Sequence, residues 1–495
     1  MRCVAVLVLV LVLVLVACGD NVTRVEDLPA CSESPPATGL TIEAAREAHR
    51  RAALRQRLRE REAVEPGYTL RATAELVEQA RIDQGLVCPQ DLYETGRILF
   101  EHAYSFTDGL SRQLRRVQTG RVGGPETTSC TSCHWRGGPG GAGGLPDATF
   151  LLGDGDRISS ADMRNPPALI GAGAVQALAQ EMTAELAKLR ADVLARAPSS
   201  VELITKGVSF GTLRVDRDGR VDTTDIRGID RDLVIKPFGW KGTTATIQEF
   251  VTEAAALHFG IESEDAALVS PHDPLTLGAG PPEDRDDDGV ADELTTGQVT
   301  ALSVYVAALE TPVMRPHERP VDLTAPQGPT EPFLTDEWIR GRELFEQIGC
   351  ASCHRPSLPL DRPMVAFESP RTNHVFELDL SRDAEAPRLT PDGAGYPVFL
   401  FSDLKRHDLG DANASTHLQA GIATKFYLTR RLWGIAGSPP YFYDGEATTV
   451  DHAVRRHGGE AAAARDAWNA LSLADSGALR IFLTSLRREP RLVVP

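Results

Sequence analysis

The sequence reads Cys130-Thr131-Ser132-Cys133-His134 and, much further along, Cys350-Ala351-Ser352-Cys353-His354. Both stretches are Cys-x-x-Cys-His, the pattern to which haem attaches covalently. Two thiols one helical turn apart reach both vinyl groups of the porphyrin, and the adjoining histidine ligates the iron. The composition gives roughly 0.003 such patterns by chance in the chain. Two copies therefore predict two haems of the c type, with His134 and His354 as proximal ligands.

Two other chemistries use paired cysteines. Such motifs can bind zinc, and a single motif can be a thiol redox centre. Here the two motifs lie far apart, each has a histidine attached, and neither stands in a βαβ pattern. Haem is therefore favoured over zinc and over thiol exchange.

Similar segments flank the two motifs. Residues 96–101 (GRILFE) precede the first motif and residues 341–346 (GRELFE) precede the second. Residues 296–309 and 476–486 close the two units, with apolar residues at helical spacing behind a Ser or Thr cap. A helix before the motif and a closing helix are the construction of a cytochrome c domain. We expect a mainly α fold, with two cytochrome c-like domains in tandem and an N-terminal helical extension.

The composition divides the chain further. A stretch rich in proline is expected to be an extended linker, and short strand signals are confined to places such as residues 211–222. Within the extension, helices are expected over residues 41–63 and 72–82. The predicted units are a signal peptide at 1–17, the extension at 18–90, a first haem domain at 91–312, the linker at 313–334 and a second haem domain at 335–495.

The N-terminus has the features of an export signal. A basic residue precedes a short apolar run, and Leu15-Val16-Ala17-Cys18 resembles a bacterial lipobox. We expect Cys18 to be lipidated, with ordinary signal cleavage nearby as the alternative. No other stretch is long and apolar enough to span a bilayer, so the lipid alone would hold the protein on the periplasmic side of a bacterial membrane.

Cys31 and Cys88 remain after the signal and the haem motifs are assigned. In an oxidising compartment disulfides persist, so we expect these two cysteines to pair with each other. The alternative is that both are buried free thiols.

The formal net charge of the chain is −17. A surface of this sign makes nucleic acid an improbable partner, because phosphates would be repelled. A basic redox partner or a small neutral substrate fits better, and the electron donor expected is a small protein of the cytochrome or cupredoxin type.

From about residue 93 to the end, the sequence resembles the di-haem oxidoreductase family of peroxidase-like proteins, also called thiol oxidoreductase-like. This family lies within the bacterial di-haem cytochrome c peroxidase superfamily. Besides the haem motifs, the blocks that carry the resemblance are residues 108–110, 164–171, 238–242, 258–260, 402–410, 432–434, 441–447 and 457–461.

The resemblance implies different roles for the two haems. The second haem should be six-coordinate, with His457 where related peroxidases have a methionine. A His/His pair gives a lower reduction potential than His/Met ligation. His452, one helical turn away, and His407 are the alternatives to His457, which could also be only a capping residue. The first haem should be the reactive one.

The distal pocket of the first haem is less defined. Met163, Trp135, Trp240 and His258 are the candidates, and we assign Trp240 to the catalytic site as a pocket or inter-haem residue. Aromatic residues are often simply core, which is the alternative. The sequence also departs from the family at Leu409, Tyr443 and Glu446, which replace the usual Met, His and Arg.

The function implied is reduction of hydrogen peroxide at the N-terminal haem, with electrons delivered through the C-terminal haem. One alternative is an electron-transfer protein with strong ligands on both irons. Another is an oxidase or oxygenase acting on an organic or protein substrate. A high-spin signal separates an enzyme from a carrier, because an open iron position is needed to bind an oxidant.

A second metal site is predicted from acidic spacing. Asp284, Asp286 and Asp288 alternate before Gly289, which places several oxygens on one side of a turn and suits calcium. Thr295 stands where a complete EF-hand has glutamate. The alternative is a solvated acidic turn.

Overall fold

The structure is a computed structural model that describes residues 42–110, 115–116, 121–122, 127–151, 158–266, 289–312, 335–393 and 395–488. Several predicted features lie outside these residues. They are the signal peptide, the lipidated Cys18, Cys31, the linker at 313–334, and the calcium ligands Asp284, Asp286 and Asp288.

The described residues are 40% helical and 16% strand, so the prediction of a mainly α fold built from two cytochrome c-like domains is wrong. The architecture is mixed, because segments between the expected helices form several small antiparallel sheets. Most of their strands are only three to five residues long. Such strands give too little sequence alternation to be recognised against the surrounding loops.

The helices confirm much of the local prediction. The expected helix at 41–63 is α2, whereas the one expected at 72–82 is divided between α3 and α4. Thr295 caps α10 with a capping box, and Ser472 caps α14. The helices are α2 Ile42–Glu62, α3 Tyr68–Leu76, α4 Gln79–Asp83, α5 Pro89–Glu101, α6 Cys130–Cys133, α7 Ala172–Leu194, α8 Ile247–Phe259, α10 Thr296–Ala308, α11 Asp336–Gln347, α12 Val450–Arg456, α13 Ala462–Asn469 and α14 Leu473–Thr484.

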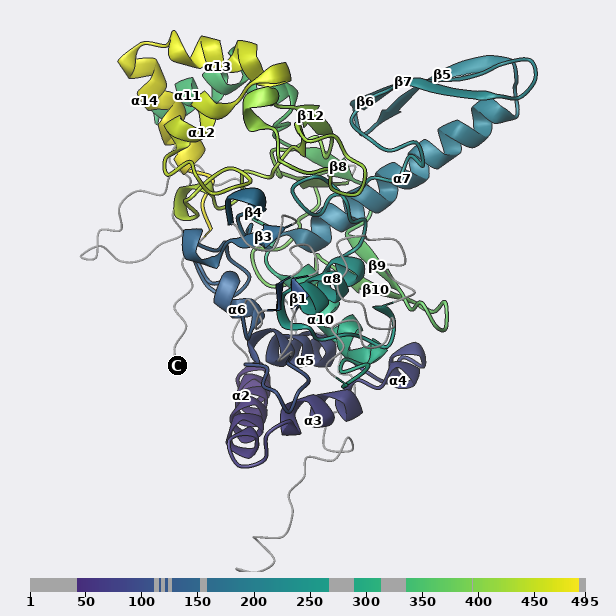
Figure 1. Ribbon diagram of the computed structural model, residues 1–495, viewed down its shortest axis with the longest axis vertical. Coiled ribbons are helices and arrows are strands. Elements are labelled where there is room, and N and C mark those ends of the chain that lie inside the picture. Colours follow the sequence, from purple (N-terminus) through teal and green to yellow (C-terminus); the bar gives the residue numbers. More distant parts are fainter. Residues whose placement is uncertain are drawn as a thin grey trace, which may run out of the picture.

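The largest sheet has the strand order β5-β6-β7 and lies at the far end of α7, away from the other helices (Figure 1). The other sheets are pairs, β1-β2, β3-β4, β8-β11, β9-β10 and β12-β13. The strands are β1 Arg115–Arg116, β2 Arg121–Val122, β3 Thr149–Leu151, β4 Asp162–Arg164, β5 Ser199–Thr205, β6 Val208–Val215, β7 Val221–Ile226, β8 Leu358–Leu360, β9 Met364–Glu368, β10 Val375–Asp379, β11 Tyr396–Val398, β12 Arg406–Asp408 and β13 Phe426–Leu428.

The internal duplication is visible in helix packing. A Cβ atom on Gly96 of α5 would lie 2.0 Å from the carbonyl oxygen of Ala301 on α10, and one on Gly341 of α11 would lie 2.2 Å from that of Ala478 on α14. Each pair of helices therefore crosses at a glycine, where no side chain separates the backbones. Aromatic contacts repeat as well, with ring centroids 5.0 Å apart for Phe100–Tyr305 and 5.3 Å apart for Phe345–Phe482.

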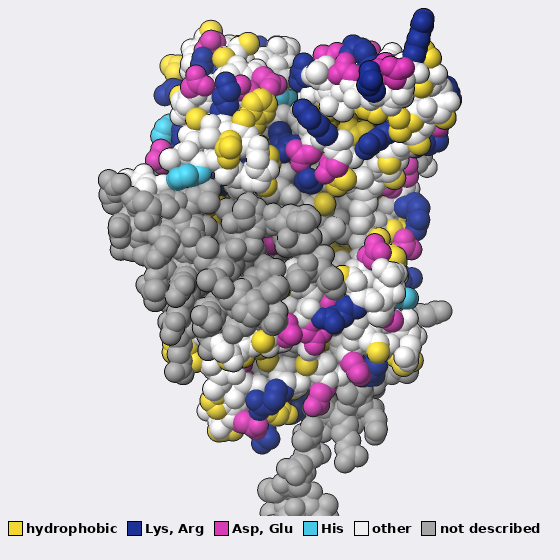
Figure 2. Space-filling model, turned by 45° about the vertical axis from the view of Figure 1, so that its right-hand side comes forward, with side chains coloured by type: hydrophobic (Ala, Val, Ile, Leu, Met, Phe, Trp, Pro, Cys, Tyr) yellow, Lys and Arg dark blue, Asp and Glu magenta, His cyan; other side chains and the backbone are white. Residues whose placement is uncertain are grey.

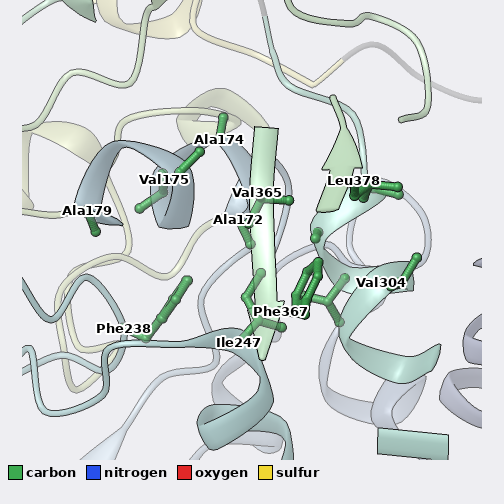
Figure 3. Packing of buried hydrophobic residues seen from close by; sticks show 14 of the residues in the cluster. Ala172, Ala174, Val175, Ala179, Phe238, Ile247, Val304, Val365, Phe367 and Leu378 are labelled. Carbon is green, nitrogen blue, oxygen red and sulfur yellow. The ribbon is translucent and has the colours of Figure 1, made fainter. Parts of the chain in front are cut away.

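The buried core connects the two halves of the chain. Strand β9 of the second half places Val365 and Phe367 against α7 and α10 of the first half (Figure 3). The N-terminal extension is part of the same core, and Gln298 of α10 donates hydrogen bonds to Leu70 and Thr73 of α3. The helices α11 and α14 enclose a second core cluster around Trp338, Phe345, Phe401, Trp468 and Phe482.

Two further predictions concern cysteine pairing and membranes. Cys88 takes part in a disulfide, but its predicted partner Cys31 lies outside the described residues, so the Cys31–Cys88 pairing stays a prediction. Among the described helices, none has both the length and the apolar character required to cross a bilayer.

Candidate haem sites

The first motif lines a cavity of about 410 Å³, here called cavity 1. Helix α6 spans only Cys130–Cys133 and places both thiols on one turn, and His134 follows as its C-cap. The Nδ1 atom of His134 lies 3.2 Å from the carbonyl oxygen of Gly141. Burial lowers the pKa of His134 to about 4, so the ring is neutral at physiological pH. A neutral ring with Nδ1 bonded to a carbonyl presents Nε2 as a metal ligand.

The second motif lines cavity 2, of about 390 Å³, and faces a second histidine there. His354 Nδ1 lies 3.0 Å from the carbonyl oxygen of Phe401, and His457 Nδ1 lies 2.8 Å from that of Ala453. The two imidazole centroids are 6.3 Å apart. Two rings joined through one metal ion, with bonds of about 2 Å, have centroids about 6 Å apart. Burial lowers the pKa of both histidines, which leaves both rings neutral as ligation requires.

The two alternatives to His457 are differently placed. His452 is exposed and is not among the residues that line cavity 2. His407 lines cavity 2, but its Nε2 lies 2.8 Å from Asp403 and its Nδ1 lies 2.7 Å from Glu460. Burial alone would lower the pKa of His407, yet its hydrogen bond to the Asp403 carboxylate raises it. A doubly protonated imidazole offers no lone pair to iron, so the geometry favours His457.

The two cavities share one wall. Asn165, Trp240, Arg430 and Arg431 line both of them. The Trp240 indole donates a hydrogen bond to the Asn165 carbonyl at 2.8 Å, and the Arg430 guanidinium lies 4.6 Å from the Trp240 ring centre. The catalytic candidate Trp240 is thus placed between the two motifs.

The shared wall also provides positive charge. Burial lowers the pKa of Arg430 to about 9 and that of Arg431 to about 10, and within the described chain neither has a carboxylate ion pair. Buried cations are normally paired, and the propionates of a haem are anions of suitable chemistry. With the thiols, the neutral imidazoles and these cations, the residues present fit a haem in each cavity.

Cavity 1 differs from cavity 2 in its other polar groups. His258 lines cavity 1, close enough for its charge to affect the pKa of His134, and Glu253 and Gln419 also line it. The Gln419 Oε1 atom is buried without a hydrogen-bond partner in the described structure. Of the other distal candidates, Trp135 is half exposed and donates to Asp147, and Met163 lies on β4; neither lines cavity 1.

Sequence reasoning missed Gln419, Arg430 and Arg431, which belong to the second half of the chain. Only the block at 432–434, which directly follows the two arginines, could have drawn attention to that segment. Asp162 of β4 accepts backbone hydrogen bonds from Thr416 and His417, and this anchors the loop that carries Gln419.

The structure places the three residues at which the sequence departs from the family, Leu409, Tyr443 and Glu446. Glu446 is largely exposed, and Arg456 forms a bidentate ion pair with Asp444 at 2.6 and 2.7 Å. Tyr443 stacks on Tyr427 with ring centroids 4.3 Å apart, and Leu409 lines cavity 2. Arg456 is neutralised by Asp444, so the positive charge that lines cavity 2 comes from Arg465 and from the two arginines of the shared wall, although the Asp-Gly block itself has lost its arginine.

A family model and two solved structures are similar to parts of this chain. The family described as "Di-haem oxidoreductase, putative peroxidase" matches residues 329–486. No curated protein matches the chain. Similar solved structures include xenon-pressurised hydrazine synthase of Kuenenia stuttgartiensis, with 16% identity over 80% of this chain and 87% of that one, at a TM-score of 0.36. Another is a MauG-like protein associated with microbial copper homeostasis, with 14% identity over 55% of this chain and 78% of that one, at a TM-score of 0.26.

TM-scores this low make both structures distant likenesses. The family match is the stronger finding, because it includes the second Cys-x-x-Cys-His motif, the two arginines of the shared wall and His457. Residues 329–486 of this chain are therefore similar to the di-haem oxidoreductase family, as the resemblance predicted.

Proposed function

We propose that this protein is an exported di-haem c-type oxidoreductase that reduces hydrogen peroxide in cavity 1 with electrons that enter through cavity 2. The observation that supports it best is the pair of cavities with one common wall and unlike polar residues. Cavity 2 has two facing histidines, whereas cavity 1 combines His134 with several groups able to exchange protons or hydrogen bonds.

The residues that would hold the cofactors follow from the site. Thioether bonds would form at the four motif cysteines, none of which takes part in a disulfide in the structure. When bound, the haems would supply one-electron redox chemistry and, at an iron with an open position, reactivity toward a peroxide. The proposed ligand set is Cys130, Cys133 and His134 in cavity 1, and Cys350, Cys353, His354 and His457 in cavity 2.

In cavity 1 the side chains have to bind a small polar oxidant and supply protons. Reduction of hydrogen peroxide to two waters consumes two electrons and two protons. Among the side chains that line cavity 1, Glu253 and His258 could exchange protons there, and the Gln419 amide could orient the oxidant by hydrogen bonding.

Trp240 would couple the two cavities. Its ring lines both, and the charge of Arg430 above the ring makes removal of an electron from the indole unfavourable. We therefore expect Trp240 to mediate electron transfer without storing an oxidising equivalent.

The test is steady-state peroxide reduction by the holoprotein with a reduced small cytochrome as donor. We expect turnover in the wild type, a small effect of Trp240→Phe, and a loss of tenfold or more in Trp240→Leu, with the haem content unchanged in all three. Wild-type protein whose haems are both low-spin and inert to peroxide would instead be an electron carrier. Oxygen uptake with organic substrates, without peroxide turnover, would identify an oxidase.

The location and partners form part of the proposal. We infer a lipid anchor at Cys18 on the periplasmic side and a small cytochrome or cupredoxin as donor. On the face of the molecule drawn in Figure 2, acidic and basic side chains are interspersed over the described surface, and neither sign forms an extended patch. Release of a Cys18→Ser variant from the membrane fraction is the expected result, and continued retention would refute the anchor.

Calcium at Asp284, Asp286 and Asp288 also belongs to the proposal. A bound ion would raise the melting temperature, because it stabilises only the folded state. Equal melting temperatures with calcium and with a chelator would argue against it.

A further inference from the structure

A group of metal-ligating side chains lies away from both cavities, where the N-terminal extension meets the first haem unit. Glu62 is the last residue of α2, His102 caps the C-terminus of α5, and Asp108 lies in the turn that follows. One ligand atom from each of these residues lies within 4.8 Å of the other two. The His102 side chain is only 7% exposed and that of Asp108 is fully buried.

We propose that Glu62, His102 and Asp108 bind a divalent cation of the zinc class. Zinc takes imidazole nitrogen and carboxylate oxygen at about 2 Å, and the edge of such a tetrahedron is about 3.3 Å. His102 Nε2 lies 3.2 Å from Asp108 Oδ2, which matches that edge. Three protein ligands leave the fourth position for water.

A second observation is independent of this spacing. Asp108 Oδ1 is buried and, in the described part of the chain, has no hydrogen-bond partner. A Cβ atom on Gly67 would lie 3.8 Å from this oxygen, and the Gly67 N–H donates to Glu62 Oε1 at 2.7 Å. Gly67 is thus a neighbour of both carboxylates, and one oxygen of Glu62 lies within 4.8 Å of one oxygen of Asp108. Two carboxylates in such proximity repel each other unless positive charge lies nearby, and Arg71, whose guanidinium lies 3.1 Å from the same Cβ position, is paired with Glu65.

The alternative is a network of hydrogen bonds without a metal. Glu62 already accepts N–H groups of Gly67 and Thr69 at the start of α3, and Ser105 donates to Asp108. These bonds do not exclude a metal, because Asp108 Oδ1 takes no part in them and each Glu62 oxygen accepts one of them and keeps a second lone pair. They leave Oδ1 of Asp108 unexplained, whereas a cation accounts for it.

A second cluster, at Cys353, Asp403 and His407, fits a metal less well. Its sulfur belongs to the haem motif, and both nitrogens of His407 are bonded to carboxylates. The cluster at Glu62 contains no residue of a haem motif, only one nitrogen of its histidine contacts a carboxylate of the cluster, and it does not depend on the proposed peroxidase function.

A cation at this place would act on the structure around cavity 1. It would join the extension to the segment between α5 and the first motif, in which Tyr104 N–H bonds the Thr128 carbonyl at 2.8 Å. Tyr104 itself lines cavity 1. The ion would thus fix the extension against one side of that cavity.

The experiment uses the full holoprotein, treated with a chelator and dialysed, then titrated with zinc chloride by calorimetry. Elemental analysis counts zinc separately from haem iron. We expect one zinc per chain, a higher melting temperature with zinc, and at least tenfold weaker binding in Glu62→Gln and in His102→Gln. Glu60→Gln, an exposed change on the same helix, is the control and should bind as the wild type does.

Two results would overturn the proposal. One is a chelator-treated wild type that takes up no zinc and melts at the same temperature with and without it. The other is zinc binding of equal affinity in wild type, Glu62→Gln and His102→Gln, which would place the ion elsewhere. Two separate variants are used so that a folding defect in one does not remove the test.

Discussion

Replacing Gly341 by alanine tests the helix crossing that positions the second motif. The new Cβ atom would lie 2.2 Å from the Ala478 carbonyl oxygen and 2.8 Å from Phe482 Cβ. Overpacking of this kind costs up to about 3 kcal/mol, and here the contact is with backbone that cannot rotate away. The higher helix propensity of alanine returns about 1 kcal/mol. The expected net loss of stability is about 2 kcal/mol.

Gly477→Ala is the matched control, because Gly477 lies on α14 and nothing approaches its Cβ position within 4 Å. It should stabilise by about 1 kcal/mol through helix propensity alone. For a unit of this size 1 kcal/mol shifts the melting temperature by about 2–4 °C. Calorimetry of the holoproteins should therefore place Gly341→Ala about 6–12 °C below Gly477→Ala. Equal melting temperatures would refute the close crossing of α11 and α14.

Three other predictions concern the cavities. His457→Ala should convert the C-terminal haem from low-spin to high-spin in the spin-resonance spectrum, because the second imidazole is lost, whereas His452→Ala should not. Arg430→Gln should lower the midpoint potentials of both haems by on the order of tens of millivolts in a spectroelectrochemical titration, since a buried positive charge favours the reduced state. Unchanged potentials would show that the charge of Arg430 does not act on the haems. His407 has a pKa raised by its hydrogen bond to Asp403, so its contribution to stability is complete below about pH 6.5 and is lost as pH rises through the raised pKa. The melting temperature of His407→Gln should accordingly fall furthest below the wild type near pH 6, and a gap that widens at alkaline pH would contradict the ion pair.

The sequence was sufficient for the parts of the structure that depend on local patterns. The motif spacing located the two cavities, and the repeat around Gly96 and Gly341 predicted the helices that pack beside them. A Ser or Thr cap was predicted for each closing helix, because capping depends on a few adjacent residues, and the caps are Thr295 and Ser472, the second of them four residues before the predicted segment. His457 was located through the family position.

The parts of the structure that the sequence did not predict depend on contacts between segments far apart in the chain. The wall between the cavities combines Trp240 with Arg430 and Arg431, which lie far apart in the chain and show no common spacing. The pairing of β9 with β10, and its packing on α7, could not be predicted for a similar reason, since short strands acquire their structure from neighbours. Gln419 reaches cavity 1 only because Asp162 anchors its loop.

The central claim is that the chain carries two haems, each attached through its own pair of cysteines. The most direct measurement is the intact mass of the denatured protein, produced together with a haem-maturation system. For the wild type we expect the mass of the mature chain plus two haems. For the double variant with Cys350→Ala and Cys353→Ala we expect the mass of the chain plus one haem. A colourless protein with the mass of the chain alone would contradict it.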